Sequence, residues 1–248
     1  MEPVGVKFVP VRLHLRRLFR LSIVSVSFLV LFPFVLEAQS ERPGDLQVWN
    51  ETTLVFPVLK TKDEKGKDVD RLSLLTFGTL RLGQNRLYPV DARVGAGFDL
   101  RLNKYFNFSP TYVYRRGEAL RNREEYEHRL RFDLTVGNKW KNFSLKDRSR
   151  VEYRIRNSRG DSVRYRNKLT FTFPVKYKDK EIFSPFVAEE WYYDFTAKEF
   201  STNEISAGIT RKLNSNTSAD IFYVRRDFNN GQLRYLNGVG VNLKIRID

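Results

Sequence analysis

The sequence has 248 residues, of which 44 are Lys or Arg and 29 are Asp or Glu, so its formal net charge is +15. It contains no cysteine, which excludes disulfide bonds and thiolate metal sites. Aromatic residues make up 14% of the chain, with 20 Phe and 12 Tyr, and this composition favours β-strands over helices.

The first 38 residues have the order of features of a cleavable signal peptide. Basic residues between Lys7 and Arg20 precede an apolar run from Leu21 to Leu36, and Ala38 supplies a small residue for cleavage. The alternative is a transmembrane anchor, but the run contains Pro33 and is shorter than the roughly 18–20 residues that an anchor needs. We therefore predict that residues 1–38 are removed and that residues 39–248 form one exported domain.

Apolar and polar residues alternate with a period of two along most of the remaining chain. A strand sorts such residues onto opposite faces, whereas a helix would scatter them around its surface. Between residues 124 and 136, one row holds Tyr126, His128, Leu130, Phe132, Leu134 and Val136, and the interleaved row holds Glu125, Glu127, Arg129, Arg131, Asp133 and Thr135. The pattern predicts strands with one apolar face and one charged face.

Turn residues divide this pattern into about eleven strands. Several are longer than the five or six residues typical of soluble sheets, and tilted strands of about ten residues suit a barrel that spans a bilayer. Because single-chain bacterial barrels normally have an even strand number, we expect ten or twelve. The strands are expected near residues 45–57, 69–82, 90–102, 104–116, 124–137, 141–156, 162–175, 182–195, 201–213, 216–228 and 235–247.

The predicted fold is all-β: a single antiparallel up-and-down transmembrane β-barrel of about 10–12 strands in the bacterial cell outer membrane. The polar rows carry arginine along much of each strand, and the apolar rows carry aromatic residues near their ends, as the girdles of such barrels do. A closed barrel also leaves no unpaired strand edge facing lipid. The alternative is a soluble β-sandwich or a lipocalin-like cup, in which strands also alternate.

The stretch from Gly97 to Phe228 resembles the outer-membrane barrel family named domain of unknown function 2490 (DUF2490). The resemblance implies a barrel with a ladder of arginine and glutamate inside, and it implies no activity, since none is assigned to the family. The residues that carry it are Glu127-His128-Arg129, the run from Arg148 to Arg154, Tyr165-Arg166-Asn167-Lys168-Leu169, Phe173-Pro174, Glu190, and Asn203 with Gly208.

The charged rows form the most unusual chemistry of the chain. We expect them to line the lumen in a register that alternates sign, because like charges directly opposite each other destabilise a sheet. Either the ladder fills and stiffens a narrow lumen, or it attracts anions into a pore or a site for a phosphorylated or carboxylated ligand. The predicted ladder comprises Arg93, Arg101, Glu125, Glu127, Arg129, Arg131, Asp133, Arg148, Arg150, Glu152, Arg154, Arg164, Arg166, Lys168 and Glu190.

The aromatic residues that we expect at the membrane interfaces are Trp49, Trp140, Trp191, Tyr192 and Tyr193. The alternative for these rings is a ligand-binding groove. His128 is the only histidine after residue 38 and lies in an apolar row, so an interfacial ring is favoured over a general base. One histidine without cysteine predicts no transition-metal site, and no cofactor is expected.

Without residues 1–38 the chain keeps 39 basic and 27 acidic residues, a net charge of +12. A basic balance often indicates nucleic acid, but an exported protein does not meet the genome. The expected partners are the lipid bilayer, lipopolysaccharide and the barrel-assembly machinery, with anionic solutes also attracted.

The predicted function is a non-enzymatic outer-membrane barrel with a structural role or a narrow anion-favouring pore. Two alternatives stay open. One is an outer-membrane hydrolase of lipid or lipopolysaccharide that would depend on His128. The other is a soluble periplasmic β-sandwich that binds an acidic ligand.

Overall fold

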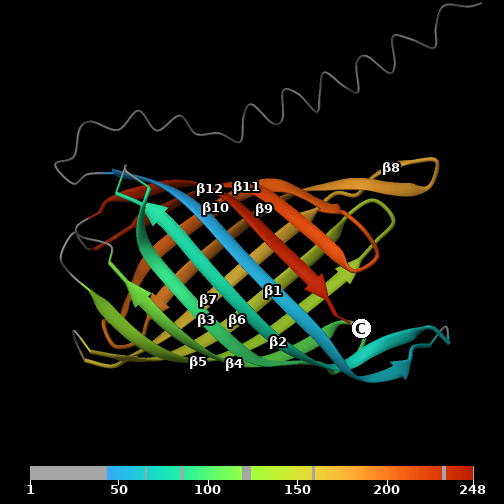
Figure 1. Cartoon of the computed structure of the whole chain (residues 1–248), viewed down its shortest axis with the longest axis horizontal. Helices are drawn as coiled ribbons and strands as arrows, with labels where there is room; N and C mark the ends of the chain where they lie inside the picture. The colour runs from blue at the N-terminus through green and yellow to red at the C-terminus, as the bar shows by residue number, and fades with distance from the viewer. Residues whose placement is uncertain are drawn as a thin grey trace, which may run out of the picture. The chain divides into compact units, whose positions relative to one another are not determined.

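The computed structural model describes residues 44–64, 66–84, 87–118, 124–157, 160–230 and 233–247. The signal peptide expected over residues 1–38 lies outside these residues. The described chain is built of strands (Figure 1), and it contains no helix long and apolar enough to cross a membrane. The strands are β1 (Gly44–Lys62), β2 (Asp68–Gly83), β3 (Tyr88–Arg101), β4 (Phe106–Gly117), β5 (Glu125–Lys139), β6 (Ser144–Arg156), β7 (Ser162–Thr172), β8 (Val175–Tyr177), β9 (Lys180–Asp194), β10 (Glu199–Lys212), β11 (Thr217–Phe228) and β12 (Tyr235–Arg246).

Eleven of these strands close into one barrel. Each pairs antiparallel with the next from β1 to β7, then β7 pairs with β9, and the series continues through β10 and β11 to β12. The ring is closed by a parallel pairing of β1 with β12, from Gly44 opposite Tyr235 to Val55 opposite Arg246. The prediction of a single all-β barrel is confirmed. The expectation of an even strand number is wrong, and an odd number of alternating strands is what makes the first and last run in the same direction.

The predicted strands are confirmed, with ends that differ by a few residues. The largest extension is at β1, which continues to Lys62, and the predicted strand 162–175 is interrupted at Phe173-Pro174. Pro174 has no backbone N–H to donate to a neighbouring strand, which is consistent with the interruption at this point. The short β8 that follows pairs with β9 and lies outside the barrel ring.

The barrel is apolar outside and charged inside. On β5 the outward side chains of Leu130, Phe132 and Leu134 are each at least 40% exposed, whereas the inward Glu127 and Arg129 are buried. Buried apolar residues form only a small cluster around Trp49, Val224 and Leu236. This inverted distribution shows that the alternative of a soluble sandwich is wrong, because a sandwich packs two sheets around an apolar core.

The outer wall carries one polar strip across β6, β7, β9 and β10. Asn167 donates to Asp147 at 2.6 Å, and Asn203 donates to Glu189 at 3.0 Å. Each carboxylate therefore has a hydrogen-bond donor on the neighbouring strand.

Two phenylalanine rings on the inner wall lie over glycines of the neighbouring strand. Phe77 is directly opposite Gly95, and Phe222 is directly opposite Gly240. A Cβ atom on either glycine would overlap the ring. Phe222 in turn meets the ring of Trp49 edge-on at 6.5 Å, so the glycine at 240 lets an aromatic contact form beside the parallel seam between β1 and β12.

We predict that Gly240→Val lowers the free energy of unfolding by about 1–3 kcal/mol, because the added methyl groups displace Phe222 from Trp49. Urea unfolding in phospholipid vesicles, followed by tryptophan fluorescence, measures the change. Gly78→Val is the matched control, since nothing lies within 4 Å of a Cβ at that position. Equal losses in the two variants would contradict the proposed packing.

Candidate functional site

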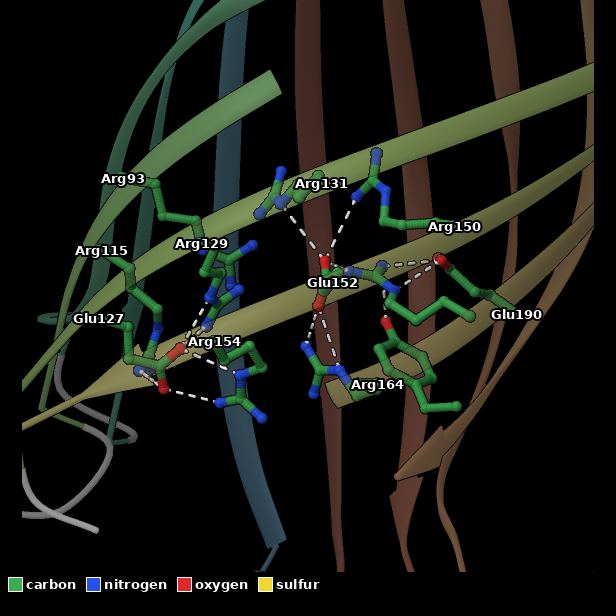
Figure 2. A network of polar contacts seen from close by, with 12 residues as sticks. Arg93, Arg115, Glu127, Arg129, Arg131, Arg150, Glu152, Arg154, Arg164 and Glu190 are labelled. Atoms are coloured by element: carbon green, nitrogen blue, oxygen red, sulfur yellow. Dashed lines mark hydrogen bonds and ion pairs between the residues drawn. The ribbon is translucent and has the colours of Figure 1, made fainter. Parts of the chain in front are cut away.

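The inward rows of the strands bring the predicted charge ladder into the lumen. The central members are buried or half-buried, and they come from β3, β5, β6, β7 and β9. Glu125 begins β5 and lies 3.5 Å from Arg115 at the edge of the network. Arg101 lies apart from the centre, because it ends β3 and donates to the carbonyl of Asn103 at 3.4 Å. Figure 2 shows Glu127 and Glu152 as the centres of two groups of guanidinium side chains.

The first group is centred on Glu127, which is fully buried. Its carboxylate lies 2.6 Å from Arg129, 2.7 Å from Arg154 and 3.2 Å from Arg115. Arg115 also lies 2.7 Å from Asp91. These pairs fill the lumen on the side of the barrel where β1 begins, which we call the Gly44 end.

The second group is centred on Glu152, also fully buried. Its carboxylate is 2.6 Å from Arg164 and 3.0 Å from Arg166, with Arg131 at 3.3 Å and Arg150 at 3.7 Å. One buried carboxylate therefore offsets the charge of several guanidinium groups.

Arg166 extends the second group to β9. Its guanidinium lies 2.8 Å from Glu190 and donates to the Tyr192 hydroxyl at 3.0 Å. Tyr192 donates to Glu204 at 3.3 Å, and Glu204 also pairs with Arg226. The charged network thus reaches from β5 across to β11.

The expected alternation of sign across the register is confirmed at some positions and wrong at others. Glu152 stands directly opposite both Arg131 and Arg164, as expected. Arg129 stands directly opposite Arg154, and Arg150 stands directly opposite Arg166. Glu190 likewise faces Glu204. The side chains reach diagonally in the narrow lumen, so guanidinium groups from several strands converge on one carboxylate and direct opposites need not attract.

Two of the five aromatic residues expected at the membrane interface lie in the lumen instead, and for them that assignment is wrong. Trp49 is 5% exposed, and the guanidinium of Arg81 stacks 3.6 Å from the centre of its ring. Tyr192 is buried among Arg166 and Arg226. Each occupies an inward-facing position of its strand, and the neighbouring positions on that face hold polar residues. Successive side chains of a strand point to opposite faces, so every second residue faces the lumen.

The remaining expected interface aromatics lie outside the lumen. Trp140 follows β5 and stacks on Phe143 at 4.7 Å. Trp191 and Tyr193 occupy the outward row of β9, and both pack against Phe200.

The charged lumen residues that sequence reasoning left out of the ladder include Asp91, Arg115, Arg81, Glu204 and Arg226. Asp91 and Arg115 belong to the same alternating rows as Arg93 and Thr111, so parity alone could have found them. Arg81 lies between Leu80 and Leu82, which gives the same signal in β2. Glu204 and Arg226 stand directly opposite each other on β10 and β11, and their pairing depends on the register of these two strands.

A cavity of about 540 Å³ lies in the lumen on the opposite side from the Glu127 group. Hydroxyl-bearing side chains such as Thr53, Ser109 and Thr170 contribute to its walls. They lie toward the end of the barrel where β5 leads into Trp140, which we call the Trp140 end. The charged residues that line the cavity comprise nine basic side chains, Arg81, Arg93, Arg131, Lys146, Arg148, Arg150, Arg166, Lys168 and Arg226, and five acidic ones, Glu51, Asp133, Glu190, Glu204 and Asp220.

Two loops at the Trp140 end are joined by an ion pair between Lys104 and Glu64 at 3.1 Å. The hydrogen bond to Glu64 and its negative charge raise the pKa of Lys104. Both side chains are exposed, so the contact contributes little to stability at physiological salt.

His128 lies on the outer face of β5, and its Nδ1 is 2.6 Å from the hydroxyl of Tyr112. Its ring also packs near Tyr114. None of the hydrogen bonds described for His128 comes from a serine or a carboxylate. Within the described residues, no group of three or more His, Cys, Asp or Glu side chains could hold a metal ion.

We predict that Glu152→Gln lowers the free energy of unfolding by roughly 3–5 kcal/mol, because it leaves several buried guanidinium groups without their shared countercharge. Urea titration in phospholipid vesicles gives the value. The matched control is Glu64→Gln at an exposed loop position, where the change stays within about 0.5 kcal/mol. A loss no larger than that of the control would show that the Glu152 group does not stabilise the barrel.

Comparison with known proteins places the chain in a family. No curated protein sequence matches it. Among solved structures, it resembles the NanC porin (TM-score 0.46, 10% identity, covering 82% of this chain and 99% of that one) and LpxR from Salmonella typhimurium (TM-score 0.42, 10% identity, 68% and 81%). It also resembles an anion-selective porin from Comamonas acidovorans (TM-score 0.37, 12% identity, 73% and 58%). The family of proteins of unknown function DUF2490 matches residues 47–237, which confirms the resemblance seen in the sequence, and the chain belongs to this family.

Proposed function

We propose that the protein is a non-enzymatic barrel of the bacterial outer membrane whose lumen is a narrow passage that favours anions. The observation that carries the proposal is the charge of the cavity lining, where nine basic side chains stand against five acidic ones. A cleft lined mainly by one sign of charge concentrates solutes of the opposite sign.

The membrane location is supported by the outer wall. Its exposed side chains include long rows of Leu, Val, Ile, Phe and Tyr, as on β5 and β12. The strands form a complete ring, so no backbone edge is left unpaired, as the hydrocarbon region of a bilayer requires.

The width of the passage differs along its length. On the Trp140 side the inward residues, such as Lys146 and Thr170, are half-buried or exposed and surround the cavity. On the Gly44 side the Glu127 group fills the interior, with Glu127, Arg129 and Arg154 all buried. The Glu127 group is thus the constriction, and any solute that crosses the barrel has to be small enough to pass between its side chains.

We predict that the folded protein in planar bilayers gives small conductance steps and a reversal potential that indicates preference for chloride over potassium. The double variant Lys146→Glu with Lys168→Glu reverses two positive charges of the cavity lining and shifts the reversal potential toward potassium. Arg225→Glu is the control, because that residue lies on the outer row of β11 and pairs with Asp227. Absence of any conductance in the wild type would contradict the passage and leave a structural role.

The location has its own test. We predict that the protein separates with the outer-membrane fraction and that boiling changes its migration on a denaturing gel, since closed barrels resist unfolding by detergent in the cold. Recovery of the chain in the soluble periplasmic fraction would contradict the proposal. A His128→Ala variant with unchanged migration and conductance is expected as well, because His128 lies on the outer face, outside the lumen.

A further inference from the structure

The cavity holds guanidinium groups whose hydrogen-bonding capacity the protein does not use. Among the described residues, five buried side-chain atoms have no hydrogen-bond partner. One is the hydroxyl of Ser162, and the other four are nitrogens of Arg81, Arg131 and Arg148. All three arginines line the cavity.

Arg131 shows this most clearly, because both its Nε and its Nη2 lack a partner while the residue is 5% exposed. The nearest carboxylate is Glu152, whose Oε1 is 3.3 Å from Nε in a geometry that makes no hydrogen bond. Glu152 already accepts hydrogen bonds from Arg164 and Arg166. A buried donor left unpaired costs about 1–3 kcal/mol, and more when it is charged.

The second carboxylate beside Arg131, that of Asp133, already accepts hydrogen bonds from another arginine. Asp133 follows Arg131 on the inward row of β5 and accepts two hydrogen bonds from Arg150, at 2.6 and 2.5 Å. In Figure 2 Arg131 and Arg150 both approach Glu152 from the same side. Positive charge is therefore concentrated next to Arg131. Neither neighbouring carboxylate accepts a hydrogen bond from the Nε or Nη2 of Arg131.

The strand next to β5 adds a neutral donor at the same level. Thr111 of β4 stands directly opposite Arg131, and its side chain lines the cavity. The ring of Phe77 lies 5.9 Å from the guanidinium carbon of Arg131. A planar fork of N–H donors beside a hydroxyl suits a small anion whose oxygens accept several hydrogen bonds.

We propose that Arg131 and Thr111 form a binding site for a small water-soluble oxyanion, such as a phosphate or sulfate group. The proposal rests on the proposed function, because the anion reaches the site through the lumen from the Trp140 end. A lipid headgroup is not the source, since the site lies inside the ring of strands. The cavity of about 540 Å³ leaves room for an anion larger than the phosphate itself.

Isothermal titration calorimetry of the folded full-length barrel in detergent tests the site, with inorganic phosphate as the probe at constant ionic strength. We expect saturable binding in the wild type and an affinity about tenfold or more lower in Arg131→Met, which removes the charge-assisted bonds. Arg131→Lys keeps the charge but loses the fork, and its affinity falls between the two. Thr111→Val removes the hydroxyl without changing charge, and a loss of about threefold to tenfold is expected.

Arg211→Met is the matched control, because it removes one positive charge from an exposed position outside the cavity, and its affinity for phosphate stays at the wild-type value. Heat-modifiable gel migration verifies that each variant is folded, and Thr111→Val keeps the test decisive if Arg131→Met does not fold. Absence of saturable phosphate binding, or equal binding by all variants, overturns the site. Chloride selectivity without phosphate binding would refute the site alone, whereas phosphate binding without conductance would refute the passage alone.

Discussion

Guanidinium groups can crowd the inside of a closed barrel only if carboxylates lie between them. Glu127, Glu152 and Glu190 meet this requirement, since each is buried and contacts at least two arginines. Moving a charge out of water costs several kcal/mol, which its ion pairs must offset. The positions of these three glutamates therefore determine where the guanidinium groups gather. They also determine which part of the lumen is filled by side chains and which part contains the cavity.

The distribution of carboxylates explains why the two sides of the lumen differ. On the Gly44 side, Asp91 and Glu127 satisfy Arg93, Arg115, Arg129 and Arg154 in a continuous chain of ion pairs. On the Trp140 side, arginine and lysine outnumber the acidic groups and hydroxyl side chains separate them. Basic and acidic groups are thus closely matched on the Gly44 side, whereas basic groups are in excess around the cavity.

The sequence predicted the strands well because burial in a barrel imposes a strict two-residue period. The row from Tyr126 to Val136 shows this, and the same parity would have placed Trp49 and Tyr192 inside had polarity been weighed above aromatic character. The contacts between strands were less predictable. The sequence does not show that Arg129 faces Arg154, or that two side-chain nitrogens of Arg131 lack hydrogen-bond partners, because both depend on register and on diagonal reach across the lumen.

The count of about eleven strands was correct, and the general rule of an even strand number wrongly replaced it with ten or twelve. How the ring closes was not predictable, because the pairing of β1 with β12 joins residues nearly two hundred positions apart and has no local signal. Because the ring has an odd number of strands, Gly44 and Ile247 emerge at opposite rims. In an even-stranded barrel both ends would share one compartment. Here, if the barrel spans the membrane as proposed, a reporter fused after Ile247 and one placed just before Gly44 would sample different sides of it.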